Sequence, residues 1–85
     1  FNFDIMYTPG HSSDSLIIIF DEIIFVGDLI FHYSHGRTDL WTSSPLQMQE
    51  SLLKIKQLFN KKNYYIYPGH DESFYSKDCY IINKL

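Results

Sequence analysis

The sequence has few of the residues that mark several classes of protein. Cys79 is the one cysteine, which excludes a disulfide scaffold and makes the reducing cytoplasm the expected compartment. No apolar run approaches the ~20 residues that span a bilayer, and four glycines and three prolines exclude a collagen-like chain. The net charge is -3 and basic residues do not cluster beyond Lys61 and Lys62, so we expect neither nucleic acid nor a membrane as a partner.

Apolar residues are frequent enough for one small domain. They make up 45% of the 85 residues, and aromatic residues make up 18%, which excludes a disordered tail. The sequence begins with Phe1 inside a strand-like pattern and shows no signal peptide. We therefore expect a fragment of a larger chain and find no indication of secretion.

Apolar patterns predict an α/β chain. Alternation over residues 1–8 predicts a first strand. The continuous apolar runs Leu16–Phe20 and 23–26 predict a hairpin of two strands that are covered on both faces. Asp21 and Glu22 would form its turn, although neither accepts a positive φ as glycine does.

One helix is predicted with a marked beginning. Ser44 fits the N-cap, Pro45 the first helical position, and Gln47 the third residue of a capping box. Its apolar face would hold Met48, Leu52, Ile55 and Phe59. Residues 31–43 are predicted to be a loop that is long for a compact domain, and such loops are often functional. Residues 64–67 are predicted to form a short strand and residues 76–85 a helical tail.

Three predicted strands are followed by a side chain that can bind a metal ion. The motifs are Pro9-Gly10-His11, Gly27-Asp28 and Pro68-Gly69-His70. Proline closes a strand and glycine allows a sharp turn, so each ligand would lie at the edge of the sheet. His and carboxylate ligands suit zinc or iron, and two His with one Asp also match the facial triad of non-haem iron.

Taken together, the motifs resemble the metallo-β-lactamase superfamily, and within it the carboxyl-terminal half of the small glyoxalase II-like hydrolases. The matching stretches have the family's order and spacing, at residues 7–15, 25–31, 36–40 and 67–70. The resemblance implies that residues 1–85 form half of an αββα sandwich, with a mixed sheet flanked by helices. The family's His-x-His-x-Asp-His signature is absent from these residues, so the resemblance implies a missing amino-terminal half as a partner.

The resemblance also implies a role for each ligand. His11 would bind the first metal ion and His70 the second, while Asp28 would bridge both and take part in catalysis. The complete domain would hold two Zn²⁺ ions, with Fe²⁺ as the alternative. A bridging hydroxide would attack a small-molecule thioester or related ester. The isolated chain would bind metal weakly and would be inactive.

The loop between the second and third motifs carries further candidates. Arg37 and Asp39 either shape the substrate pocket or form an ion pair that pins the loop near the metal ions, and we favour the ion pair. We expect His32 and His35 to be loop histidines, although His35 could touch substrate, and Trp41 to be a packing anchor.

Two other functions stay open. Persulfide dioxygenases of the same superfamily carry similar motifs and hold one iron with two His and one Asp, of which His11 and Asp28 would be two. The motif Pro68-Gly69-His70 mildly favours the hydrolase, because the dioxygenases usually carry alanine before the corresponding His. The last alternative is a non-catalytic fragment that docks with a separate half through an exposed apolar sheet face.

Overall fold

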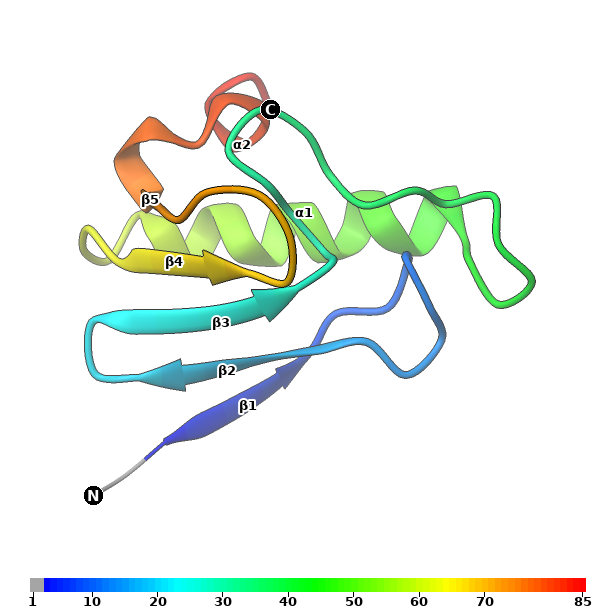
Figure 1. Cartoon of the computed structure of the whole chain (residues 1–85), viewed down its shortest axis with the longest axis horizontal. Helices are drawn as coiled ribbons and strands as arrows, with labels where there is room; N and C mark the ends of the chain where they lie inside the picture. The colour runs from blue at the N-terminus through cyan, green and yellow to red at the C-terminus, as the bar shows by residue number, and fades with distance from the viewer. Residues whose placement is uncertain (1–2) are drawn as a thin grey trace.

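The chain folds into one mixed sheet with helices against it. The computed structural model describes residues 3–85. Five strands lie in chain order, and β3 and β4 are parallel while the other neighbours are antiparallel (Figure 1). The strands are β1 (Asp4–Tyr7), β2 (Leu16–Phe20), β3 (Ile23–Gly27), β4 (Tyr65–Pro68) and β5 (Phe74–Tyr75). The helices are α1 (Pro45–Phe59) and the short α2 (Tyr80–Asn83), preceded by a 3-10 turn at Ser76–Asp78.

The predicted strands are confirmed with small shifts in their ends. The first begins at Asp4 rather than at residue 1, and residues 1–2 of that prediction lie outside the described residues. The turn between β2 and β3 is the predicted tight one, and Asp21 takes the left-handed conformation there, with φ of 52°. Asp tolerates this region better than most residues, which is why the turn closes without glycine.

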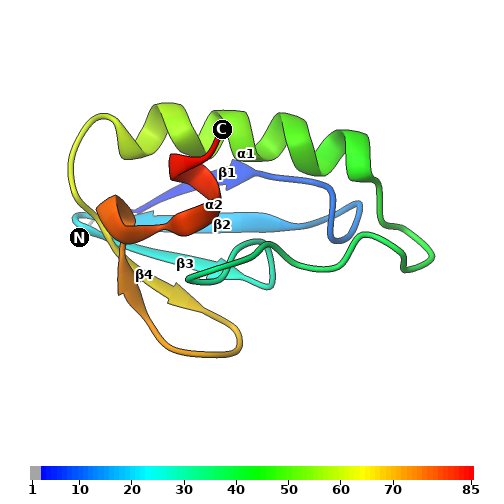
Figure 2. The same ribbon diagram turned by 90° about the horizontal axis from the view of Figure 1, so that it is seen from above.

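The expectation that β2 and β3 are covered on both faces is wrong for the described residues. Ile17 and Ile24 are buried beneath the helices, whereas Phe25 on the other face is 48% exposed. Figure 2 shows α1 and α2 on the same side of the sheet. The open face carries an apolar row in which Ile5 pairs with Ile18, Ile18 with Phe25, and Phe25 with Tyr67.

Helix α1 begins where the sequence predicts. The Ser44 side chain accepts a hydrogen bond from the backbone N–H of Gln47 at 3.1 Å. The N–H of Ser44 itself, which a capping box would pair with the Gln47 side chain, donates instead to the carbonyl oxygen of Gly10 at 2.7 Å. The start of α1 is therefore attached to the loop that carries His11.

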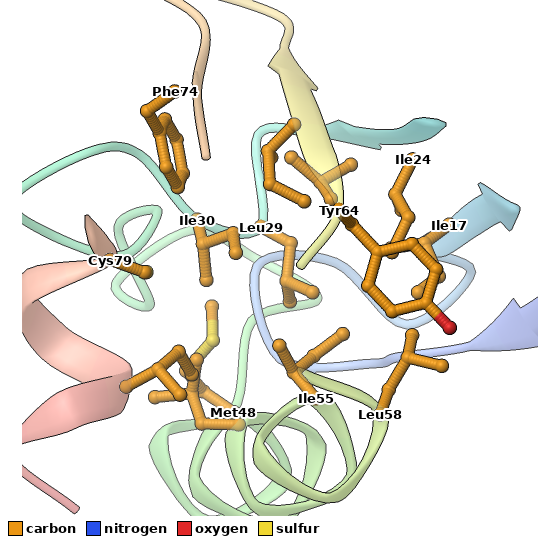
Figure 3. Close-up of a cluster of buried hydrophobic side chains, with 14 residues drawn as sticks. Ile17, Ile24, Leu29, Ile30, Met48, Ile55, Leu58, Tyr64, Phe74 and Cys79 are labelled. Atoms are coloured by element: carbon orange, nitrogen blue, oxygen red, sulfur yellow. The ribbon is translucent and has the colours of Figure 1, made fainter. Parts of the chain in front are cut away.

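The core lies between α1, α2 and the covered face of the sheet. Met48, Ile55 and Leu58 of α1 point toward side chains of the sheet, among them Ile17 and Ile24 (Figure 3). Burying each such side chain contributes roughly 1.5–3 kcal/mol relative to leaving it exposed. This packing fixes α1 against the sheet and so fixes the ends of the strands.

The predicted helical tail is only partly correct. Residues 76–78 form a 3-10 turn, Cys79 is extended with ψ of 107°, and α2 has four residues. Cys79 is fully buried at this break, and its burial raises the pKa of its thiol. Among residues 3–85, none of the helices has the length and apolar content to cross a membrane.

Candidate metal centre

The topology of the sheet brings the three predicted ligands to one edge. Because β1 and β3 are both antiparallel to β2, and β4 is parallel to β3, the three strands run in the same direction (Figure 1). Their carboxyl ends therefore share an edge, and His11, Asp28 and His70 all follow those ends. Ligand sites of α/β sheets form at such edges.

The Asp28 carboxylate contacts both histidines. Its Oδ1 accepts a hydrogen bond from Nδ1 of His70 at 2.7 Å, and its Oδ2 lies 3.8 Å from Nε2 of His11. The three side chains line one hollow of about 310 Å³, together with Phe31, Gly36 and Arg37. The structure thus brings the three predicted ligands together, while their binding of metal stays a prediction.

The hydrogen bond of His11 leaves Nε2 free for a cation. Nδ1 of His11 lies 2.9 Å from the carbonyl oxygen of Arg37, which can only accept, so Nδ1 carries the proton. In the neutral ring Nε2 then holds a lone pair and faces the Asp28 carboxylate. Two such atoms attract a shared cation, and a backbone carbonyl on the second nitrogen is the usual support of a metal-binding histidine.

His70 is oriented by Asp28 and is otherwise open. A carboxylate only accepts, so Nδ1 of His70 donates to Asp28 and the lone pair of the neutral ring is at Nε2. The His70 side chain is 73% exposed. The Phe31 ring approaches it edge-on, with ring centroids 6.4 Å apart.

The described chain offers part of a donor set. Within residues 3–85, no group of three or more His, Cys, Asp or Glu side chains is arranged to hold a metal ion by itself. The contacts run through Asp28, and the two histidines meet different oxygens of it. The three side chains fit a metal ion in their chemistry, and further ligands would have to come from elsewhere.

Two glycines allow loops to close around Asp28, which sequence reasoning missed. A Cβ atom at Gly36 would overlap the carbonyl oxygen of Asp28 and lie 3.1 Å from Nδ1 of His11. A Cβ atom at Gly69 would lie 2.7 Å from Oδ1 of Asp28. Both positions occur inside recognised motifs, but only the fold shows which atoms they make room for.

The loop that precedes α1 is attached to His11 by one backbone carbonyl and one side-chain hydroxyl. Besides the Arg37 carbonyl, the Ser43 hydroxyl donates to the carbonyl oxygen of His11 at 2.5 Å. Arg37 and Asp39 do form an ion pair, with two hydrogen bonds of 2.7 and 3.0 Å, and both side chains are exposed. The guanidinium of Arg37 lowers the pKa of Asp39, and the carboxylate in turn raises the pKa of Arg37.

The same loop carries Trp41, which is expected to pack, and His35, which is expected to be a loop histidine. Trp41 is not a packing anchor, because its side chain is 99% exposed. His35 is a loop histidine whose Nδ1 donates to the carbonyl oxygen of Gly36 at 2.6 Å.

Known sequences that are similar to this chain include metal-dependent hydrolases. A family model described as the metallo-beta-lactamase superfamily matches residues 3–70. A probable metallo-hydrolase of Methanocaldococcus jannaschii is 37% identical over 73 residues, which are 85% of this chain and 35% of that protein. A hydroxyacylglutathione hydrolase of Hydrogenovibrio crunogenus is 33% identical over 72 residues, which are 85% of this chain and 25% of that protein. The chain thus spans between 25% and 35% of these relatives.

Comparison with solved structures gives the same fold. The B3 metallo-beta-lactamase BLEG-1 superposes with a TM-score of 0.78 at 30% identity, over 86% of this chain and 35% of that one. A protein crystallised in a di-iron-bound form gives 0.77 at 31% identity, over 87% and 37% of the two chains. ETHE1 from Myxococcus xanthus gives 0.73 at 32% identity, over 86% and 34%.

Proposed function

The chain belongs to the metallo-beta-lactamase superfamily, and we propose that it is the carboxyl-terminal half of a glyoxalase II-like hydrolase. Its substrate would be a small-molecule thioester or related ester. The observation that carries this proposal is the Asp28 carboxylate, placed between His11 and His70 at an edge shared by three strands. Because each oxygen of this carboxylate faces a different imidazole, Asp28 could serve two neighbouring metal ions.

Each residue of the site then has a role. His11, through Nε2, and Asp28 would hold one ion, and Asp28 and His70 would hold the other. When bound, the ions polarise the substrate carbonyl and lower the pKa of a bound water from ~15.7 toward ~7. Phe31 forms an apolar wall of the hollow beside the ligands.

Arg37 and Asp39 would hold the loop in shape rather than bind substrate. The Arg37 guanidinium and the Asp39 carboxylate are joined by two hydrogen bonds and have opposite charges. The carbonyl of Arg37 orients His11. An exposed guanidinium that is already paired has little charge left for an anionic substrate. Arg37 is thus a supporting residue of the first metal ligand.

The missing half of the fold would cover the open sheet face. The exposed row of Ile5, Phe25 and Tyr67 is a contiguous apolar surface of the kind that another sheet or a partner covers. The small share of the relatives' length that this chain spans leaves room for such a half. It would also supply the ligands that the described residues lack. If the chain is instead a non-catalytic fragment that docks with a separate half, it would use the same face.

Zinc is the metal that we propose, with two ions in the complete domain. Imidazole and carboxylate ligands suit Zn²⁺, and they also suit iron, which the di-iron-bound structural relative holds. The buried, unpaired thiol of Cys79 fits a reducing compartment, and we propose the cytoplasm.

A mononuclear iron enzyme of the persulfide dioxygenase kind is the second candidate. It is favoured by the hydrogen bond from His70 to Asp28, because this is the position of a residue that orients a ligand rather than binds the metal. In that case His11 and Asp28 would bind one iron and His70 would support Asp28.

The His70→Ala variant separates the two candidates. We would measure metal content by mass spectrometry on the protein in the length in which its cells make it. A dinuclear hydrolase holds two ions and loses one in the variant, and it hydrolyses thioesters. A mononuclear enzyme holds one ion in both forms, and it consumes oxygen with a persulfide. Absence of bound metal after reconstitution with either Zn²⁺ or Fe²⁺ would refute both.

A further inference from the structure

His32, which sequence analysis expects to be an ordinary loop residue, is held on several sides. Its Nδ1 lies 2.8 Å from Oε1 of Glu72, and since a carboxylate only accepts, the ring donates. Its ring stacks parallel to Phe74 with centroids 5.1 Å apart and an angle of 5°, and on Tyr33 at 4.2 Å. The side chain is only 22% exposed. This environment is more constrained than that of a solvated loop histidine.

These contacts join the two loops that carry the proposed ligands. One loop follows β3 and contains Asp28 and His32, and the other follows β4 and contains His70 and Glu72. The loops meet first at the Asp28–His70 hydrogen bond and again at the His32–Glu72 bond. The backbone carbonyl of His32 also accepts a hydrogen bond from the N–H of Tyr80 at 3.1 Å, which fixes the first loop to the carboxyl-terminal segment.

The second loop needs such an attachment. Asp71, next to His70, has a φ of 66°, a left-handed conformation that persists in a residue other than glycine when the surroundings enforce it. His70 itself is largely exposed, so little packing around its ring enforces that turn. After the turn come Glu72, whose side chain is 65% exposed, and Phe74, whose ring is buried, and His32 contacts both.

We propose that His32 is a positioning residue, which holds the turn after His70 and thereby presents the His70 ring to Asp28 and to the second metal ion. The proposal rests on the proposed dinuclear function for its metal-binding consequence only. Its structural consequence, the orientation of the His70 ring, is independent of metal.

The test compares variants that remove one contact at a time. His32→Phe keeps the ring stack and removes the donor, and Glu72→Leu removes the acceptor. Glu72→Gln keeps an acceptor oxygen and serves as the conservative rescue. Glu50→Gln on the exposed side of α1 is the matched control for loss of a carboxylate. All variants are made in the protein in the length in which its cells make it, and thermal unfolding establishes that each is folded.

Two measurements are made on each variant. Competition with a chromophoric chelator gives the zinc affinity of the two sites, and nitrogen-proton NMR of the metal-free protein reports the Nδ1–H of His70. We expect His32→Phe and Glu72→Leu to weaken the second zinc ion roughly tenfold while the first is retained, as loss of an outer partner of a metal ligand does. The same two variants should lose the protected His70 Nδ1–H signal, whereas Glu72→Gln and Glu50→Gln should keep it.

The outcomes distinguish the two proposals. An unchanged His70 signal and unchanged second-site affinity in both His32→Phe and Glu72→Leu would overturn the role of His32. If the parent protein binds no second zinc ion, the dinuclear function fails, and the NMR signal still decides whether His32 positions His70. Equal weakening of both zinc ions would indicate general loosening of the fold and would also count against the role of His32.

Discussion

The backbone N–H of Ser44 donates to the carbonyl oxygen of Gly10 at 2.7 Å, so the first turn of α1 is bonded to the turn that presents His11. The neighbouring Ser43 hydroxyl bonds to the carbonyl oxygen of His11 itself. Within α1, the Ser51 hydroxyl donates to the carbonyl oxygen of Pro9 at 2.7 Å. The position of the first proposed ligand therefore depends on where α1 packs.

Packing of α1 can be tested with two adjacent leucines. Leu52 is 6% exposed and faces the sheet, while Leu53 is 49% exposed. Leu52→Ala should lower the free energy of unfolding by about 2–5 kcal/mol, because it leaves a cavity in the core, and Leu53→Ala by less than about 1 kcal/mol. Urea unfolding followed by circular dichroism measures both. Equal losses would mean that the buried face of α1 is assigned wrongly.

Gly36→Ala tests the close approach of the loop to Asp28. The added methyl group would overlap the Asp28 carbonyl oxygen, so the loop must move, at a cost of about 1–3 kcal/mol in the free energy of unfolding. Because Arg37, which follows, orients His11, zinc affinity should fall as well. Ser34→Ala, an exposed change in the same loop, is the control and should alter neither quantity. Wild-type affinity in Gly36→Ala would show that the loop is not needed for the site.

Thr8→Val should stabilise the protein. The Thr8 side chain is fully buried, and within residues 3–85 its hydroxyl has no hydrogen-bond partner. Removing a buried hydroxyl without a partner recovers its desolvation cost, which is about 1–3 kcal/mol, and valine has the same shape. Thr42→Val, at an exposed threonine, should give no such gain. Denaturant midpoints decide, and a destabilised Thr8→Val would indicate that a partner for this hydroxyl exists in the protein.

The Arg37–Asp39 pair predicts a small dependence of stability on pH. The pKa of Asp39 is lowered in the folded state, so the pair stabilises the protein above the unfolded pKa of about 4, and this contribution is lost as the pH falls through the lowered value. Asp39→Asn should therefore reduce the loss of stability between pH 5 and pH 3. High salt should shrink the difference, because both groups are exposed. Asp78→Asn is the comparison, and an identical pH profile in Asp39→Asn and the parent would refute the prediction.

Much of the fold is readable from local patterns. The β-branched runs of β2 and β3 and the cap at Ser44 each have one dominant local solution, so their elements lie where the sequence predicts. The tail was less predictable, because Cys79 is held extended by burial rather than by any local signal. Two residues are too few for a strand pattern, so β5 was not foreseen.

The sequence predicts which candidate ligands lie together, but not the residues that support them. Three strand ends with metal-binding side chains are visible in the sequence, and strand direction brings them together. The contacts of Ser43, Gly36 and His32 join residues far apart in the chain and follow no spacing rule, so only the fold reveals them. The expectation for Trp41 is wrong for a different reason. A large aromatic side chain suggests burial, but the loop exposes this one.

The bond between Asp28 and His70 joins residues that are 42 positions apart. The entropy of closing so long a segment, which includes α1, must be lost for that bond to form. A growing polypeptide that has not yet released β4 from the ribosome therefore lacks the paired site, however well its earlier strands have folded. The proposed capture of a cation through His70 would become available only after β4 has been synthesised.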